Sequence, residues 1–218
     1  LEIYRQVAED ELAIPVILGA KSKQETFAGA DVTYTMEAMM HDGKALQAGT
    51  SHNLGQNFTK MFDIKFLDKD GELKYAWSTS WGISTRLIGA IIMVHGDNRG
   101  LKMPPKITPI QVVIVPIATH KEGVLDKAYE LKKLLEDKYR VELDAREEYS
   151  AGWKFNEWEM KGVPLRLEIG PRDIENNQVT AVRRDTLEKF TLPMDNLAEK
   201  IEEILEDIHN TMYKIAAE

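Results

Sequence analysis

The sequence predicts two successive architectures, an α+β fold in the first half and an α/β fold in the second. In the first half, apolar and polar residues alternate around Asp-Gly turns, which is typical of antiparallel hairpins. In the second half, residues 107–117 form a nearly continuous apolar run, which is typical of a strand buried on both faces of a sheet. A Pro-Pro pair interrupts both patterns between them. We therefore predict a first domain at residues 1–98, a linker at 99–106 and a second domain at 107–218.

Composition limits the classes of function. With 43% hydrophobic and 29% charged residues, the chain has the composition of an ordinary globular protein. No apolar run approaches the ~20 residues that cross a bilayer, and no signal peptide is evident, so we expect no membrane partner and a cytoplasmic location. The absence of cysteine excludes disulfides and thiolate zinc sites. A net charge of −8 argues against DNA binding through a broad basic surface, but not against a local site that contacts a few bases.

The first domain begins with a helical pattern over residues 1–12, followed by a short strand at 16–18 and a polar loop. Residues 31–38 alternate as a strand does. An Asp-Gly turn follows at Asp42 and Gly43, and residues 44–50 then return as the partner strand.

A short helix is predicted next, with Ser51 as its N-cap. His52 falls in the first turn, where the positive end of the helix dipole favours a neutral imidazole. The apolar residues that carry this pattern recur at helical spacing, namely Leu54, Phe58, Met61 and Phe62.

A hairpin at residues 63–77 leads into residues 80–98, which predict a strand end, a turn of small residues, Arg86 and then a buried helix. Low side-chain bulk around one arginine suits a flat ligand that lies on the sheet with a charge held against it. The plainer interpretation is an ordinary strand-to-helix corner with a solvated arginine.

The second domain is predicted as a compact α/β fold with a mixed sheet, because strands and amphipathic helices alternate. After the buried strand, the expected elements are a helix at 122–140, a strand at 141–143, a helix at 153–161, a strand at 163–169, a hairpin at 179–192 and a long helix at 195–216.

Familiar catalytic motifs are missing. The sequence contains no Gly-x-Ser-x-Gly, no Walker loop, no His-Glu-x-x-His and no Gly-x-Gly-x-x-Gly, and its five histidines do not cluster at metal-ligand spacing. Nothing here indicates a hydrolase or a side-chain nucleophile.

Several stretches together resemble the prolyl-tRNA synthetases in the form found in archaea, eukaryotes and some bacteria. They are residues 27–31, 47–58, 80–86, 93–98 and 152–159. The resemblance covers nearly the whole chain. It implies part of a class II synthetase catalytic core, built on an antiparallel sheet, followed by an α/β anticodon-binding domain. Residues 80–98 would be class motif 3.

The resemblance implies a two-step reaction. ATP and L-proline give prolyl-adenylate, and the prolyl group then passes to the 3′ end of tRNA(Pro). Arg86 would lie against the adenine and meet the γ-phosphate, as a planar, always-charged fork can. The other implied roles are ATP binding by Gln47, Thr50 and Ser84, a Mg²⁺ contact near Gln47, and a proline pocket of His52, Trp81 and Gly82.

In the second domain the resemblance implies tRNA anticodon binding. Aromatic faces can stack on unpaired bases while polar groups bond their edges. The candidates are Trp153, Lys154, Glu157 and Lys161. The plainer interpretation is that the aromatic residues belong to the core and the charges are solvated.

The chain departs from the family pattern at several points. Thr85 stands where the general motif 3 has a glutamate, as prolyl enzymes allow. Class motifs 1 and 2 and the C-terminal zinc domain have no counterpart, so we expect this piece to be inactive alone, although the family forms homodimers. Two alternatives stay open: another class II synthetase such as the threonyl type, and a non-catalytic RNA-binding module.

Overall fold

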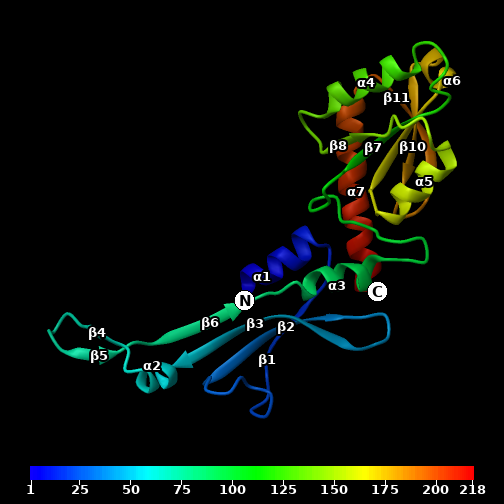
Figure 1. Ribbon diagram of the computed structural model, residues 1–218. Coiled ribbons are helices and arrows are strands. Elements are labelled where there is room, and N and C mark those ends of the chain that lie inside the picture. The colour runs from blue at the N-terminus through cyan, green and yellow to red at the C-terminus, as the bar shows by residue number, and fades with distance from the viewer. The chain divides into compact units, whose positions relative to one another are not determined.

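The computed structural model describes residues 1–218. Contacts within the chain divide it into two compact units (Figure 1). The first comprises Leu1–Asp10 and Ile14–Val94, and the second comprises Glu11–Ala13 and His95–Glu218. Residues 99–106, predicted as a linker, therefore lie within the second unit.

A four-stranded antiparallel sheet forms the first unit, in the order β1-β2-β3-β6. Alternating residues and an Asp-Gly turn produce the central β2–β3 hairpin, as predicted from the pattern. The strands are β1 (Ile17–Ala20), β2 (Val32–Met39), β3 (Ala45–Gly55) and β6 (Ser78–Gly82).

Strand β3 is longer than predicted and overturns one expected helix. Ser51 and His52 lie in β3, where they pair with β2 on one side and β6 on the other. The prediction that Ser51 caps a helix is therefore wrong, and the helix-dipole argument for His52 does not apply. Hydrogen bonding to two neighbouring strands outweighs a helical spacing of apolar residues, and the helix begins only after Gly55.

Short elements complete the first unit. The helical pattern at the N-terminus is confirmed as α1 (Glu2–Gln6), continued by a π-helical segment (Val7–Glu11). A separate hairpin follows α2 (Asn57–Met61) and consists of β4 (Lys65–Leu67) and β5 (Leu73–Tyr75). Helix α3 spans Arg86–His95. It is buried on one side only, because Ile88 and Ile92 are largely exposed, in contrast to the fully buried helix expected.

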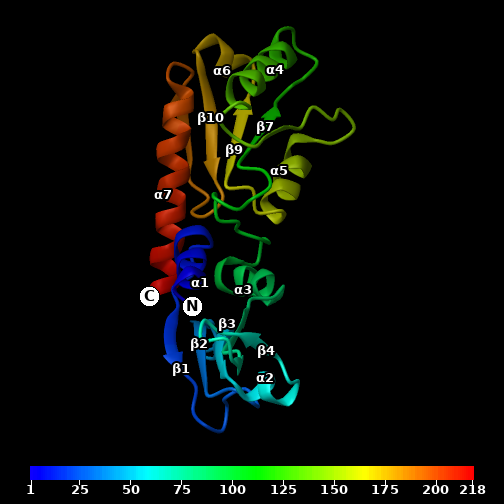
Figure 2. The ribbon, with the colours of Figure 1, turned by 90° about the vertical axis from the view of Figure 1, so that its left-hand side faces the viewer.

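Both faces of the sheet in the second unit are covered (Figure 2). Its strand order is β11-β10-β9-β7-β8, with β7 parallel to β8 and β9 and the remaining pairs antiparallel. The predicted mixed sheet is therefore confirmed. The strands are β7 (Val112–Pro116), β8 (Val141–Leu143), β9 (Leu165–Ile169), β10 (Gln178–Arg183) and β11 (Lys189–Pro193).

Helices α4 and α7 pack on one face of this sheet and α5 on the other. Leu131 of α4 and Ile201 of α7 share a core cluster with Leu167, whereas Trp158 of α5 packs with Val113. The helices are α4 (Val124–Leu135), α5 (Ala151–Met160), α6 (Pro171–Glu175) and α7 (Leu197–Ala217). The short helix α6 was not predicted.

The segment before β7 is held by hydrogen bonds rather than extended into solvent. The Leu101 amide donates to the Met160 carbonyl at 3.0 Å, and the Met103 amide donates to the Gly162 carbonyl at 3.1 Å. Pro104 and Pro105 are buried, so the segment predicted as a linker is packed against the rest of the second unit.

Candidate functional site

A row of polar side chains crosses the sheet of the first unit. Cross-strand partners share a face, and in β3 Thr50 pairs with Gly82 while His52 pairs with Ser80 and, on its other side, Thr33. Thr50 and His52 are two residues apart in a strand, so they also share that face. The structure therefore brings Thr50, His52 and Gly82 together on one face of the sheet.

A β-bulge adds Gln47 to this row. Gln47 is three residues from Thr50, so in a regular strand the two would face opposite ways. The β2–β3 register shifts after Met36, so that Glu37 pairs with Gln47 and Ala48 is left as the extra residue. This shift returns Gln47 to the face of Thr50, as bulges near binding sites often do.

Arg86 lies at the corner between β6 and α3. Its Nη1 donates to the Gln47 carbonyl at 3.1 Å, while the side chain stays exposed. The Ser84 hydroxyl accepts from the Arg86 amide at 3.3 Å, which stabilises the first turn of α3. Ser84 thus has a structural role that the sequence did not reveal, and Arg86 presents its charge beside the polar row.

A second cation, Lys21, also contacts Gln47. Its Nζ donates to Gln47 Oε1, and the same lysine lines a hollow of about 290 Å³ with Glu25, Thr35 and Glu37. Lys21 falls in the loop after β1, and nothing in the sequence pattern singled it out. Arg86 and Lys21 together make this edge of the row suited to an anion.

His52 is fixed on two sides. Its Nδ1 is 2.9 Å from Thr33 Oγ1, and its ring centroid lies 5.0 Å from that of Phe27. Phe27 belongs to a stretch that carried the family resemblance, but no role had been given to it. An imidazole beside an aromatic ring provides one polar and one apolar surface.

Trp81 lies apart from this group. It pairs with Ser51, so it projects from the opposite face of the sheet to His52, and it is 67% exposed. The expected pocket of His52, Trp81 and Gly82 is therefore not assembled within these residues, because successive residues of β6 alternate between faces.

In the second unit, the predicted base-binding residues have different environments. Lys154 is only 3% exposed, and its Nζ donates to the Asp144 carbonyl at 3.1 Å. Trp158 is also buried, and its Nε1 donates to Asp144 Oδ2 at 2.8 Å. Lys154 is therefore part of the interior, and its ammonium group is not available to a base, in contrast to the predicted role in base binding.

Asp144 is the buried anion of this cluster. Burial by itself raises the pKa of a carboxyl, but hydrogen bonds from Arg146 and Trp158 and the charge of Lys154 outweigh it and lower the pKa of Asp144 to about 2. Asp144 therefore stays ionised at neutral pH, and it holds Arg146 by a bidentate contact at 2.8 and 2.7 Å.

Glu157 and Lys161 form an ion pair at 2.7 Å one helical turn apart. Arg146 also donates to Glu157, and the hydrogen bonds from Lys161 and Arg146 hold the pKa of the Glu157 carboxyl below its usual range. The Glu157 carboxylate is partly accessible. It can accept a hydrogen bond from a base edge if it releases Lys161 or Arg146.

The most accessible aromatic surface here is a stacked pair. The rings of Tyr149 and Trp153 lie 3.9 Å apart at an angle of 13°, and the Arg146 guanidinium lies 4.9 Å and 5.3 Å from their centroids. Both rings are well exposed, at 38% and 45%. We call these three residues the aromatic platform. Sequence reasoning found Trp153 but missed Tyr149, four residues earlier, and Arg146.

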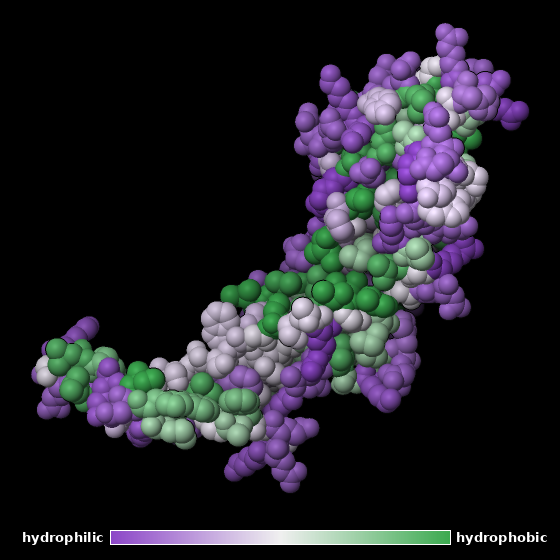
Figure 3. All heavy atoms as spheres, viewed as in Figure 1, coloured by the Kyte–Doolittle hydropathy of each residue, from purple (hydrophilic) through white to green (hydrophobic).

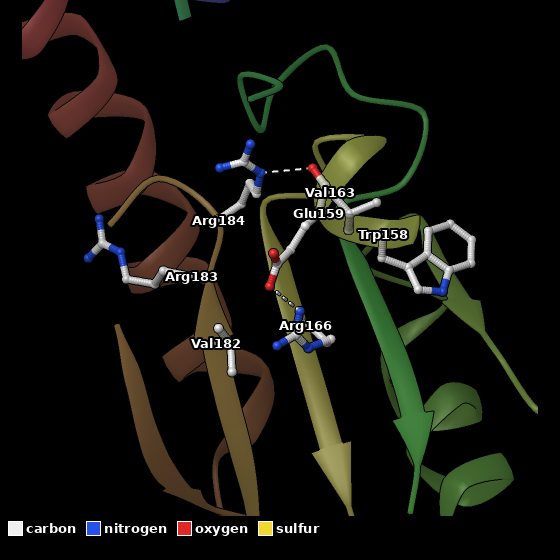
Figure 4. Close-up of a pocket in the computed structure, with 7 residues that line it drawn as sticks. All are labelled: Trp158, Glu159, Val163, Arg166, Val182, Arg183 and Arg184. Carbon is white, nitrogen blue, oxygen red and sulfur yellow. Dashed lines mark hydrogen bonds and ion pairs between the residues drawn. The ribbon is translucent and has the colours of Figure 1, made fainter. Parts of the chain in front are cut away.

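A shallow hollow at the end of α5 is lined by charges already paired with one another (Figure 4). Arg166 Nη1 donates to Glu159 Oε1 at 3.2 Å, and Arg184 Nε donates to the Glu159 carbonyl at 2.8 Å. Arg184 is almost fully buried and also pairs with Asp97 at 2.7 Å. These contacts hold the segment at Asp97 against α5, so the basic residues of this hollow are not free cations.

Two comparisons with known proteins agree with these observations. Residues 111–204 match the anticodon binding domain family. Over 97% of its length the chain is 68% identical to a proline–tRNA ligase of Alkaliphilus oremlandii, covering 44% of that protein. It is 62% and 61% identical over 99% of its length to proline–tRNA ligases of Natranaerobius thermophilus and Clostridium novyi, covering 45% of each.

The chain thus spans a little under half the length of these curated relatives. None of its helices combines the length and the hydropathy needed to cross a membrane. The match covers 97–99% of the chain and therefore extends through both units. The chain is therefore similar along nearly its whole length to proline–tRNA ligases, and residues 111–204 of its second unit match the anticodon binding domain family.

Proposed function

We propose that the protein to which this chain belongs is a proline–tRNA ligase, which activates L-proline with ATP and transfers the prolyl group to tRNA(Pro). The first unit would supply part of a class II catalytic core, and the second would bind the anticodon. The observation that carries this proposal is the polar row of Gln47, Thr50 and His52 beside Arg86. In a chain similar to proline–tRNA ligases, this row would supply part of what adenylate formation requires.

That reaction needs charge stabilisation more than a nucleophilic side chain. The proline carboxylate attacks the α-phosphate and pyrophosphate leaves, so the protein must position the reactants and stabilise charge. Arg86 can stack on a base and bind a phosphate oxygen. Lys21 adds a second cation, and Gln47 and Thr50 provide uncharged polar groups beside them.

We propose that Glu37 and Gln47 contact Mg²⁺, because these residues pair across β2 and β3 and their side chains lie on the same face of the sheet. Carboxylate and amide oxygens suit this ion, which usually completes its coordination with phosphate oxygens and water. No group of three or more acidic or imidazole side chains in the chain could hold a metal alone. Lys21 would also have to leave Gln47 Oε1. We therefore infer a Mg²⁺ that arrives with the nucleotide.

The test is proline-dependent ATP–pyrophosphate exchange by the intact gene product. We expect Arg86→Ala to lower exchange by ~10²-fold or more, because it removes a preorganised group from developing charge. Arg172→Ala, which removes an exposed arginine of the second unit, is the matched control and should leave exchange unchanged. Exchange that is absent with every amino acid, or equally reduced in both variants, would contradict the proposal.

A non-catalytic RNA-binding module remains the second candidate, because the aromatic platform would serve it equally well. In either case we expect Trp153→Ala to weaken tRNA(Pro) binding by about tenfold, since a stacked base contributes ~1–3 kcal/mol. Tyr129→Ala removes an exposed aromatic residue of α4 and is the control. Filter binding at two salt concentrations would separate stacking from phosphate contacts. Equal affinities of the Trp153→Ala and Tyr129→Ala variants for tRNA(Pro) would exclude the aromatic platform as a binding surface.

The two candidates differ in exchange activity. Retained tRNA binding without exchange by the intact gene product would favour the RNA-binding module. Homodimer formation belongs to the ligase proposal, and sedimentation of the intact gene product tests it.

A further inference from the structure

The buried hydroxyl of Thr33 has no role in the proposed site so far. Thr33 lies in β2, is 1% exposed, and pairs across the sheet with His52. Its Oγ1 accepts a hydrogen bond from the Phe27 amide at 3.0 Å and lies 2.9 Å from His52 Nδ1. It is therefore a link between the loop that carries Phe27 and the imidazole of the polar row.

The donor in the Thr33–His52 hydrogen bond can be identified by counting the protons and lone pairs of the threonine hydroxyl. A threonine hydroxyl has one proton and two lone pairs. The Phe27 amide occupies one lone pair, and the acceptor that the structure provides for the proton is His52 Nδ1. If Nδ1 donated instead, the buried hydroxyl proton would lose its acceptor, which is unfavourable for a group removed from water. Nδ1 is therefore the acceptor, and in the neutral ring the proton is on Nε2.

The same loop also limits the position of the ring. Phe27 donates its amide to Thr33 and places its own ring 5.0 Å from the imidazole centroid. The ring of His52 is thus held by a hydrogen bond on Nδ1 and by an aromatic neighbour. Of its two ring nitrogens, Nδ1 is occupied by Thr33 and Nε2 is the one available to a ligand.

We propose that Thr33 is a positioning residue that fixes His52 as the Nε2–H tautomer, so that His52 donates to an oxygen of the bound amino acid. The inference rests on the proposed function and names the substrate group that this residue contacts. An N–H donor has nothing to offer the ammonium of proline, which is itself only a donor, but it can bond the carboxylate. The Phe27 ring provides an apolar surface beside it for the aliphatic ring.

The tautomer can be measured directly on ¹⁵N-histidine-labelled chain by a two-bond ¹H–¹⁵N correlation spectrum, with His52→Gln to assign the signal. We expect wild type and Thr33→Ser to give the Nε2–H pattern, and Thr33→Val to populate the Nδ1–H form. An Nδ1–H pattern in the wild type, or an unchanged tautomer in Thr33→Val, would overturn the proposal. If Thr33→Val fails to fold, the wild-type and serine spectra still decide it.

A second measurement tests the substrate group, using the intact gene product. In Thr33→Val we expect the KM for proline in exchange to rise by about tenfold, with the KM for ATP unchanged and Thr33→Ser close to wild type. Inhibition by pyrrolidine, which keeps the ring and the ammonium but has no oxygen, should not change. Equal losses for proline, ATP and pyrrolidine would mean general damage and would overturn the proposal. Absence of exchange would refute the proposed function but leave the tautomer result standing.

Discussion

The two units differ in how they bury their apolar residues. In the second unit, strands β7, β9 and β10 are largely buried, and side chains on one face of the sheet cluster with α4 and α7 while Val113 and Val115 on the other face cluster with Trp158 of α5. The cluster that contains Met36 in the first unit is smaller and has three buried members, Ala8, Met36 and Ala48. The difference shows that a sheet covered on both faces supplies its own stability, whereas a half-covered sheet leaves large apolar residues at the surface.

The first unit exposes these residues in two places. The segments of α2 and β4–β5 present four large apolar residues that are each 66–75% exposed, and Figure 3 shows hydrophobic residues at this end of the molecule. They are Met61, Phe62, Leu67 and Leu73. A two-stranded hairpin is at best marginally stable in water. The outer side of α3 adds a second apolar surface. We therefore expect the first unit to open at lower free energy than the second.

The largest expected effect comes from the two cores. Leu167→Ala should lower the free energy of unfolding of the second unit by ~2–5 kcal/mol, because it leaves a cavity in a fully buried sheet. Met36→Ala should have its effect on the first unit instead. Hydrogen exchange read by segment would show faster exchange in β7 and β9 for the former and in β2 and β3 for the latter. If either substitution loosens both units equally, the comparison fails.

An intermediate effect is expected at Asp144. Because folding lowers its pKa from 3.8 to about 2, the ionised carboxylate stabilises the second unit above pH ~4, and this contribution is lost as the pH falls from about 4 to about 2. Asp144→Asn should therefore cost about 2 kcal/mol at pH 7 and almost nothing near pH 2. Urea unfolding across this pH range measures it, with exposed Asp137→Asn as control. A pH-independent loss would show that packing, rather than charge, accounts for the effect.

The smallest effect is expected on the exposed side of α3. Ile92 is 47% exposed and Ile91 is 8% exposed, although they are neighbours. Ile92→Ser should change the free energy of unfolding by no more than ~0.5 kcal/mol, as exposed substitutions usually do. Ile91→Ser should lower the free energy of unfolding by several times as much, because Ile91 is buried. Similar losses for the two variants in urea would mean that this surface of α3 is covered in solution.

The sequence predicted the second unit well because each strand and helix there has a clear period and a clear end. The buried run of β7 and the apolar stripe of α7 leave little choice of structure. The exception is α6, whose five residues are too few for a period to emerge. Its signal was local: Pro171 follows Gly170, and Asp173 accepts from the Gly170 amide at 2.9 Å.

The first unit was harder to predict, because cross-strand pairing decides its structure. Ser51 and His52 are compatible with a helix start as well as with a strand, and only the two neighbouring strands select the strand. The burial of Lys154 could not be predicted from the sequence either, because a lysine near two tryptophans is also typical of a base-binding surface. Its real partner, Asp144, lies ten residues away in sequence.

The candidate site was anticipated in its residue types but not in its geometry. Arg86 stands at the strand-to-helix corner that the pattern predicted. The supporting residues Lys21, Thr33 and Phe27 lie in or next to a polar loop without periodicity, so only the folded chain brings them to Gln47 and His52.

The extra residue at Ala48 is an insertion that β3 accommodates through its bulge. Ala48 is 5% exposed, so small apolar replacements should be accepted. Its deletion would place Gln47 two residues from Thr50 in a regular strand, so Gln47 would stay on the face of Thr50 and could keep its pairing with Glu37. A one-residue gap in an alignment at this point would therefore remove the bulge and the buried methyl group of Ala48, but it would not by itself change which residue faces the site.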